Sequence, residues 1–563
     1  MKSGRWTCIV HALLSIWFEA TIIFSSANNA CSSSNGNDPT CQEAQSLSFP
    51  NLGRPLRPSD LPEPTVFTDF QNTTITLPNG IRQEVASGKA TQINNVVKGG
   101  NDVLADLAVL SQAVHRSSIE EILNLLRDYE DYDDDPDTVD GMPSYEIFVD
   151  NPELYTETET LKYRDVDPKF VTERKLLRGK LNAIMKPYID TIITPIIHER
   201  YPDACTARGP NRLCTPCYSL IRRYQHGQRQ SHATHHDGHA VVTAVISLSD
   251  YDIDYRGGLY AATGHGQKQF LALNKGDAVI HQSGLLHGVQ VHDVLDNPTK
   301  TERWSWILWY RDSPTCNDFG YEWFADCAYQ GDALCQQLHS TKVGEQPGIS
   351  GQETSKQVLD LNIKAAAGGA GMAAVKVARA YLHQLPSALP FDIAKAAEYY
   401  QLAIQSDNPD GHFGMAQLIL VGIMNDYQGK SNQGDAWKDP RLAQVVKHLE
   451  LASYSGHAFA QFNLGMVHTF GYNNTDPNID TDLAGQWFEF CGLPEGYFVA
   501  SHQAKAVGNL QRENQMMERA KIMGHFAPWR AQARHNTGSG GATGVDLNLP
   551  WPPNFENRQP PRF

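Results

Sequence analysis

The feature that most constrains the fold is a pair of small or apolar residues that recurs in the second half of the chain. The members of each pair are four residues apart, and successive pairs lie 42 and then 44 residues apart: Ala374 with Ala378, Ala416 with Leu420, and Ala460 with Leu464. Each pair is followed by a second segment with helical periodicity: AKAAEYYQLA, LAQVVKHLELA and LAGQWFEFC. Because small residues let helices approach closely, this period predicts helix pairs that stack into an α-solenoid.

A different pattern runs from Tyr218 to Trp309, where short apolar or alternating segments are separated by Gly, Asp and Asn. The segments are SLIRRYQ, AVVTAVISL, GLYAA, KQFLAL, DAVIHQ, HGVQV and RWSWILWY. Such segments are typical of antiparallel strands. We expect a β domain, specifically a double-sheet jelly roll, preceded by a helix that begins at Ser117 and a second helix around 173–198. The fold class is therefore α+β plus all-α.

These patterns divide the chain into segments. Residues 28 to about 100 are rich in Ser, Asn, Pro and Thr and lack periodicity, so we expect little order there. The predicted units are a leader (1–27), a low-order segment (28–104), the β-containing domain (105–315, with a β core at 218–310), a linker (316–365), helical repeats (366–530) and a disordered tail (531–563).

The leader indicates the compartment. Lys2 and Arg5 precede a mostly apolar run, CIVHALLSIWF, and small residues follow it, as in a cleaved signal peptide. The run is also nearly long enough for a single membrane anchor. Both interpretations place the protein in the secretory pathway, in the endoplasmic reticulum lumen or secreted, and the sequons at Asn72 and Asn473 agree with glycosylation there.

Nine cysteines follow the leader, and in an oxidising compartment several of them should pair. Cys214 and Cys217 form a CxxC motif, which can also be half of a zinc site or a redox motif. The chain contains no second CxxC, and no thioredoxin-like pattern surrounds this one. Disulfides are therefore the favoured interpretation.

Histidines and an aspartate gather in SHATHHDGHA, residues 231–240. Residues two apart on a strand share a face, so His235 and Asp237 can reach one ion while His236 points away. A third ligand would complete a facial triad that suits iron, and the candidates are His287 and His292, of which His287 is favoured by strand parity. No role is assigned to the remaining histidines, which are His232, His236, His239 and His281.

A predicted strand that contains an arginine follows the histidine candidates. In TERWSWILWY, Arg303, Ser305 and Ile307 share one face. Arg303 offers a planar fork for a carboxylate, with the Ser305 hydroxyl beside it.

In this order, RRYQHGQ, THHDGHAVVTAVISLS, YRGGLY, NKGDAVIHQSGLLHGVQV and ERWSWILWYRD resemble the iron(II)- and 2-oxoglutarate-dependent dioxygenases of the prolyl 4-hydroxylase and lysyl hydroxylase branch. The resemblance spans about 105 to 312. It implies that Fe(II) is bound by His235, Asp237 and His287. It further implies that 2-oxoglutarate is bound by Arg303, with Ser305 and Tyr224 lining its pocket. The interval from His287 to Arg303 is longer than the family usually has, and His292 would restore it.

The implied reaction consumes 2-oxoglutarate and O2, yields succinate and carbon dioxide, and hydroxylates a peptidyl proline or lysine, with ascorbate as a further cofactor. The segments GHFGMAQLILVGI and GHAFAQFNLGMVHTFGY in turn resemble Sel1-like repeats, relatives of the tetratricopeptide family, which implies a protein substrate or partner on these helices.

Two other functions are alternatives to a dioxygenase. A zinc hydrolase is one rival, although the histidine register differs from HxHxDH. A non-catalytic interaction protein is another. The net charge of -16 argues against nucleic-acid binding.

Overall fold

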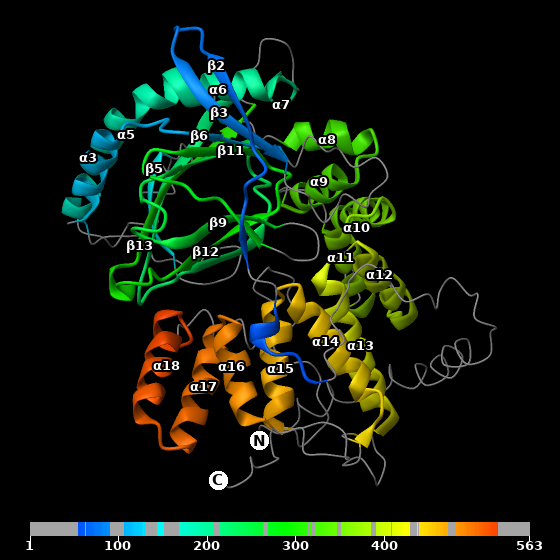
Figure 1. Cartoon of the computed structure of the whole chain (residues 1–563). Helices are drawn as coiled ribbons and strands as arrows, with labels where there is room; N and C mark the ends of the chain where they lie inside the picture. Colours follow the sequence, from blue (N-terminus) through cyan, green and yellow to red (C-terminus); the bar gives the residue numbers. More distant parts are fainter. Residues whose placement is uncertain are drawn as a thin grey trace.

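The computed structural model comprises a β-sheet region followed by a helical region that curves beneath it (Figure 1). The structure describes residues 54–61, 64–89, 106–127, 129, 144–150, 168–206, 213–262, 268–312, 316, 321–345, 351–383, 390–406, 408–427, 436, 438–470 and 480–526. The leader, the Asn473 sequon and the C-terminal tail lie outside these residues. Among the helices of the described part, none is both long and apolar enough to cross a membrane.

Two sheets form the β region. The smaller sheet has the strand order β1-β10-β9-β12-β7, and the larger has the order β2-β3-β4-β11-β8-β13-β6-β5. Their central strands are β6 (Thr215–Gln225), β7 (Ser231–His235), β8 (Val242–Ser247), β9 (Arg256–Ala262), β10 (Lys268–Phe270), β11 (Ala278–Gln282), β12 (His287–His292) and β13 (Glu302–Arg311). The predicted strands are confirmed, and their pairings with one another are antiparallel.

Side chains alternate between two cores because successive strand residues point to opposite faces. Trp304, Trp306 and Leu308 of β13 pack in the core between the larger sheet and the helices beside it. Those helices are α3 (Arg116–Arg127), α5 (Pro168–Tyr188) and α6 (Thr194–Arg200), which lie along the larger sheet in Figure 1. The opposite face of the larger sheet meets the smaller sheet, and Tyr224, Val245 and Val289 are among the residues packed between them. The candidate ligands belong to this second face.

The N-terminal segment is more ordered than its composition predicts. The expectation of low order across 28–104 is wrong for β2 (Gln71–Thr76) and β3 (Arg82–Lys89), which pair with each other and extend the larger sheet through β4 (Asp106–Leu110). Five of the six residues of β2, QNTTIT, are exposed. Since β2 buries so little, it carries no apolar alternation, and its order comes from main-chain pairing at the sheet edge. The sequon residue Asn72 is exposed on this strand.

The helical region runs from α8 to α18, and consecutive helices pack against one another. Its helices are α8 (Tyr321–Tyr329), α9 (Ala333–Glu345), α10 (Gly351–Ala367), α11 (Gly371–His383), α12 (Ile393–Gln405), α13 (Pro409–Tyr427), α14 (Leu442–Tyr454), α15 (Ala458–Phe470), α16 (Thr481–Phe490), α17 (Pro494–Ala506) and α18 (Leu510–Ile522). The recurring small and apolar pairs of the sequence are all buried, each on the first helix of a pair. Asp392 and Asp480 cap the helices that follow, α12 and α16, by accepting from main-chain N–H groups.

The segment 316–365 is not a linker. It contains α8, α9 and α10, and a disulfide between Cys327 and Cys335 joins α8 to α9. The segment contains many Gln, Ala, Lys and Leu residues, which are good helix formers. Its glycines suggest a linker in the sequence, but Gly331 (φ 96°) lies in the turn between α8 and α9.

Two contacts tie the helical region back to the β region. Leu56, which precedes β1 (Thr65–Val66), lies in the core formed by α13 to α16, and its main-chain N–H donates to Glu450 at 3.1 Å. Arg519 of α18 donates to the side chain of Gln230, immediately before β7. These contacts hold the helical region at its middle helices and at its last helix.

The cysteines form three disulfides among the described residues: Cys205–Cys214, Cys217–Cys316 and Cys327–Cys335. Each member of the CxxC motif belongs to a different bridge, so the favoured disulfide interpretation is confirmed over a zinc or redox motif. Cys491 is a buried free thiol, and Cys31 and Cys41 lie outside the described residues.

Candidate metal centre

His235, Asp237 and His287 come together at one end of the two sheets. The antiparallel pairing of β12 with β7 sets His287 directly opposite His235. Asp237 is not on a strand, as strand parity assumed, but two residues past the end of β7. The ligand atoms of the three residues all lie within 4.8 Å of one another, and they form the one such group found in the described part of the chain.

Main-chain hydrogen bonds aim both imidazoles at the carboxylate. Nδ1 of His235 lies 2.8 Å from the carbonyl of Ala233, and Nδ1 of His287 lies 2.9 Å from that of Leu285. A carbonyl only accepts, so each Nδ1 carries the hydrogen and each neutral ring presents its Nε2 lone pair. These Nε2 atoms lie 3.4 and 3.6 Å from Asp237 oxygens. The arrangement is the one that metal-bound histidines use, with the second nitrogen fixed by a hydrogen bond.

The pKa shifts favour an ionised Asp237 and a neutral His287. Burial alone would raise the pKa of Asp237, but the positive charge that His287 and His235 can carry brings it well below its usual range. Burial lowers the pKa of His287 well below its usual range. Both directions leave the groups in the protonation states that bind a metal.

The other histidines are not part of the group formed by His235, Asp237 and His287. His292 lies at the far end of β12, with its ring 5.4 Å from that of Phe270. Of the unassigned histidines, His232 and His281 are buried beside the candidate ligands, with ring centroids 4.4 Å from His235 and His287 respectively. His239 is exposed against Trp309. The structure thus brings His287, and not His292, to His235 and Asp237.

Arg303 lies inside the same pair of sheets and is 1% exposed. Its guanidinium carbon is 5.6 Å from the ring centres of both Tyr224 and Tyr255, and Nη1 donates to the Ser305 hydroxyl at 3.4 Å. Nε has no hydrogen-bond partner among the described residues, and no described carboxylate lies within ion-pair distance of the guanidinium. A buried cation without a counter-ion is costly, so this position suits an anionic ligand.

A glycine pair makes room for this guanidinium. Gly257 and Gly258 in RGGLY have φ values of 70° and 91°, a region that side chains rarely adopt. A Cβ at Gly258 would lie 2.6 Å from the ring of Tyr255 and 3.3 Å from Nε of Arg303. Gly258 therefore keeps the space beside Arg303 free of a side chain, whereas Gly257 allows the close approach of the Gln290 carbonyl.

The residues present fit an iron and 2-oxoglutarate site. Two imidazoles and one carboxylate are the donor set of the facial triad, which leaves positions for further ligands. The unpaired guanidinium of Arg303, within the same pair of sheets, supplies the complement of a carboxylate.

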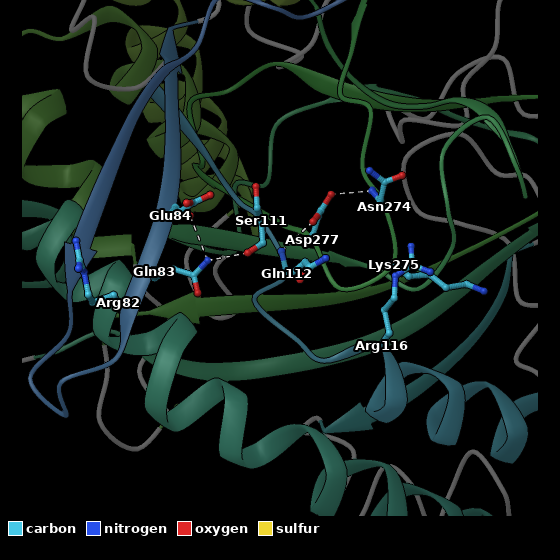
Figure 2. Close-up of a pocket in the computed structure, with 9 residues that line it drawn as sticks. All are labelled: Arg82, Gln83, Glu84, Ser111, Gln112, Arg116, Asn274, Lys275 and Asp277. Carbon is cyan, nitrogen blue, oxygen red and sulfur yellow. Dashed lines mark hydrogen bonds between the residues drawn. The ribbon is translucent and has the colours of Figure 1, made fainter.

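A polar pocket of about 660 Å³ lies elsewhere, at the junction of β3, β4, α3 and the turn before β11 (Figure 2). Two of its cations already have partners: Arg116 pairs with Asp250, and Lys275 lies 3.0 Å from Glu120. The Asp277 carboxylate accepts from the main-chain N–H of Gln112 at 2.9 Å. The pocket contains none of the predicted site residues, and its charged groups are largely neutralised.

Sequence reasoning missed two groups around the centre. Thr243 donates to Asp237 at 2.7 Å from the adjoining strand β8. Tyr255 supports Arg303 and donates to the carbonyl of Leu273 at 2.9 Å. The signal for Thr243 was a hydroxyl among apolar residues in AVVTAVISL, which also contains Ser247. Tyr255 forms an isolated bridge with Tyr251 just before β9, and no sequence pattern marks it.

Comparison with known proteins gave structural likenesses only. No known protein family and no curated protein matches the sequence. Among solved structures, a Sel1 repeat protein from Oxalobacter formigenes is 19% identical, with a TM-score of 0.30, over 39% of this chain and 60% of that protein. The chain thus spans under two thirds of that protein's length.

Two oxygenase structures are also similar. A 2OG-Fe(II) oxygenase family protein from Burkholderia pseudomallei is 15% identical, with a TM-score of 0.22, over 37% of this chain and 84% of that protein. A prolyl-4-hydroxylase from Pseudomonas putida is 14% identical, with a TM-score of 0.22, over 39% and 96%. At these TM-scores the function rests on the site itself.

Proposed function

We propose that the chain is an Fe(II)- and 2-oxoglutarate-dependent dioxygenase that hydroxylates a peptidyl residue, proline or lysine, of proteins in the secretory pathway. One observation carries the proposal: His235, Asp237 and His287 converge inside the same pair of sheets that buries Arg303 without a carboxylate partner among the described residues.

The sheet orders support a jelly-roll assignment for this domain. Strands β6 to β13 divide between two facing sheets, as β11-β8-β13-β6 and β10-β9-β12-β7. In a jelly roll the two sheets face each other, and the inward-facing residues of both sheets surround one interior. We assign residues 105–315 to the dioxygenase domain, with β2 and β3 as an N-terminal extension, and the helices that follow to a Sel1-like solenoid.

Each site residue has a defined task. The Nε2 atoms of His235 and His287 and the carboxylate of Asp237 would hold Fe(II), which supplies the oxidation chemistry when bound. Arg303 would pair with the distal carboxylate of 2-oxoglutarate, and the Ser305 hydroxyl would share that anion. Tyr224 and Tyr255 enclose the guanidinium and exclude water, which strengthens its attraction for the co-substrate.

The surroundings of the site suggest how a protein substrate is held. The helical region is tied to the β region at Leu56 and at Arg519, and stacked helix pairs of this kind bind proteins along their concave face. We propose that this face presents the substrate segment to the dioxygenase. Ascorbate is proposed as the reductant that keeps the iron in the Fe(II) state.

The proposal is tested by incubating the purified protein with Fe(II), ascorbate, 2-oxoglutarate and an acceptor peptide, and measuring succinate. We expect succinate from the wild type and none from Asp237→Ala. A wild type that binds neither iron nor 2-oxoglutarate would contradict the oxygenase assignment. Mass spectrometry of secretory proteins with and without the active enzyme would then identify the residue that gains one oxygen.

A further inference from the structure

A buried hydroxyl contacts the carboxylate of the candidate metal centre. Thr243 of β8 is 1% exposed, and its Oγ1 donates to Oδ2 of Asp237 at 2.7 Å. Asp237 is itself 3% exposed. A hydrogen bond to a buried carboxylate is stronger than one between neutral groups, so this contact is one of the firmest restraints on the Asp237 side chain.

The position of Thr243 is fixed by the larger sheet and does not depend on the turn that carries Asp237. Thr243 pairs with His281 of β11 on one side and with Trp309 of β13 on the other. Asp237 lies beyond the end of β7, outside any strand pairing. The rigid strand therefore provides a reference point for a ligand on an irregular segment.

The contact also distinguishes the two carboxylate oxygens. Each oxygen lies near one imidazole, Oδ1 at 3.4 Å from Nε2 of His235 and Oδ2 at 3.6 Å from Nε2 of His287. Of the two, Oδ2 is the one that accepts from Thr243, which leaves Oδ1 without this bond. The terminal torsion of an aspartate is broad and roughly two-fold. Without a partner on one oxygen, the carboxylate could turn and present either oxygen or both to an ion.

We propose that Thr243 is a positioning residue for the metal centre: it holds Oδ2 of Asp237 and so assigns Oδ1 to the metal as a single ligand atom. This inference rests on the proposed ligand set. Limiting Asp237 to one oxygen keeps the remaining metal positions available to a co-substrate that binds through two atoms and to O2.

Three variants separate positioning from general stability. Thr243→Val replaces the hydroxyl with a methyl of similar size, and Thr243→Ser keeps the hydroxyl. Thr234→Val is the matched control, because Thr234 lies on β7 next to His235 and its hydroxyl contacts that of Tyr260 at 2.9 Å. Binding of Mn(II) to the metal-free full-length protein is measured by calorimetry, together with Tm and the visible absorption spectrum of the Co(II) form.

We expect Thr243→Val to weaken Mn(II) binding by about 10–100-fold, the range seen when an outer partner of a metal ligand is lost, and to change the Co(II) spectrum. Thr243→Ser should stay within roughly threefold of the wild type, below the effect of losing the partner. Thr234→Val should leave binding and spectrum unchanged.

The outcomes that overturn the inference are distinct from those that overturn the function. A wild type that binds Mn(II), with a Thr243→Val variant of equal affinity and spectrum, refutes the role of Thr243 and leaves the dioxygenase assignment intact. A Thr243→Ser variant as weak as Thr243→Val also refutes it, because the hydroxyl would not be the cause. A wild type without metal binding refutes both.

Discussion

Two arginines, one in each region of the molecule, show how differently the regions use the charge of a guanidinium. Arg441 of the helical region lies 2.6 Å from Asp426 and 2.7 Å from Asp439. Arg303 of the β region, at 1% exposure, has the Ser305 hydroxyl at 3.4 Å and no carboxylate among the described residues. The first guanidinium is neutralised within the fold. The second is left for a ligand, and we infer that the β region contains the chemistry while the helical region provides a surface.

Buried histidines repeat the contrast. In the helical region, His457 lies 2.8 Å from Asp410, and the Nδ1 atoms of His412 and His448 are 3.0 Å apart, so these groups partner one another. In the β region, two imidazoles direct their Nε2 lone pairs at one carboxylate. Matched variants in the two regions therefore test whether this difference in function holds.

The largest expected effect comes from removing the carboxylate of the candidate centre. In Asp237→Ala, Mn(II) affinity should fall by more than about 100-fold, beyond the range for loss of an outer partner, as measured by calorimetry. Asp410→Ala is the counterpart in the helical region. It should lower Tm, because buried His457 loses its partner, and leave metal binding unchanged. Equal metal affinities in all three proteins would end the distinction.

The next effect concerns the disulfides. Cys217–Cys316 spans 99 residues, which include all the candidate site residues, whereas Cys327–Cys335 in the helical region spans 8. On the chain-entropy estimate, replacing both cysteines of the long bridge by serine should lower the free energy of unfolding by about 4–5 kcal/mol, against about 2–3 kcal/mol for the short one. Denaturant unfolding measures both, and the reverse order would show that loop length does not govern their contribution.

Substitution of the two arginines should separate ligand binding from stability most clearly. Arg303→Gln should weaken 2-oxoglutarate binding by about 10–100-fold, from the loss of charged hydrogen bonds, with little loss of Tm because an unpaired buried cation is removed. Arg441→Gln should lower stability by up to about 1 kcal/mol, since the site is partly exposed, and leave 2-oxoglutarate binding unchanged. Calorimetry and thermal unfolding distinguish the two. A large drop in Tm for Arg303→Gln would mean that this arginine is structural.

The smallest effect is a pH dependence of the helical region. Burial, together with the positive charge that His448 could carry, lowers the pKa of His412 to about 3, and burial lowers that of His448 to about 4. These folded values lie below the unfolded value, so the unfolded chain binds more protons as the pH falls. Stability is present above about pH 6.5 and declines toward pH 4, by up to about 1.4 kcal/mol per pH unit for each residue.

Thermal unfolding between about pH 7.5 and pH 5 measures this decline. The double variant His412→Gln with His448→Gln should show a flatter profile than the wild type. If the two profiles were parallel, the histidine pair would not be the source.

Sequence patterns predicted the inner strands and those site residues that lie on them, because strand residues obey strict periodicity. Asp237 was placed by the same argument, although it lies past the end of β7. The alternation in RWSWILWY placed Arg303 and Ser305 together, and the structure buries both. Alternation along β12 likewise predicted that His287 and His292 lie on opposite faces. The recurring pairs of small or apolar residues four apart predicted helices in the second half of the chain, and every member of these pairs is buried.

The rest depended on tertiary context. Strand β2 is nearly all exposed, so no periodicity marks it, and its order comes from pairing with β3. The helices α8 to α10 were obscured by scattered glycines, whose role as helix ends depends on backbone conformation. Thr243 of β8 contacts Asp237, which lies past the end of β7, and no rule that works within one strand connects residues so placed.

The proposed function requires that Fe(II) and 2-oxoglutarate bind together between the two sheets. An anaerobic titration tests it directly: Fe(II) and then 2-oxoglutarate are added to the full-length protein, and the visible charge-transfer absorption of an iron-bound 2-oxo acid is recorded. We expect the band in the wild type, its absence in Asp237→Ala, and a need for much more 2-oxoglutarate in Arg303→Gln. A wild type without the band, or a band that persists in Asp237→Ala, would contradict the account.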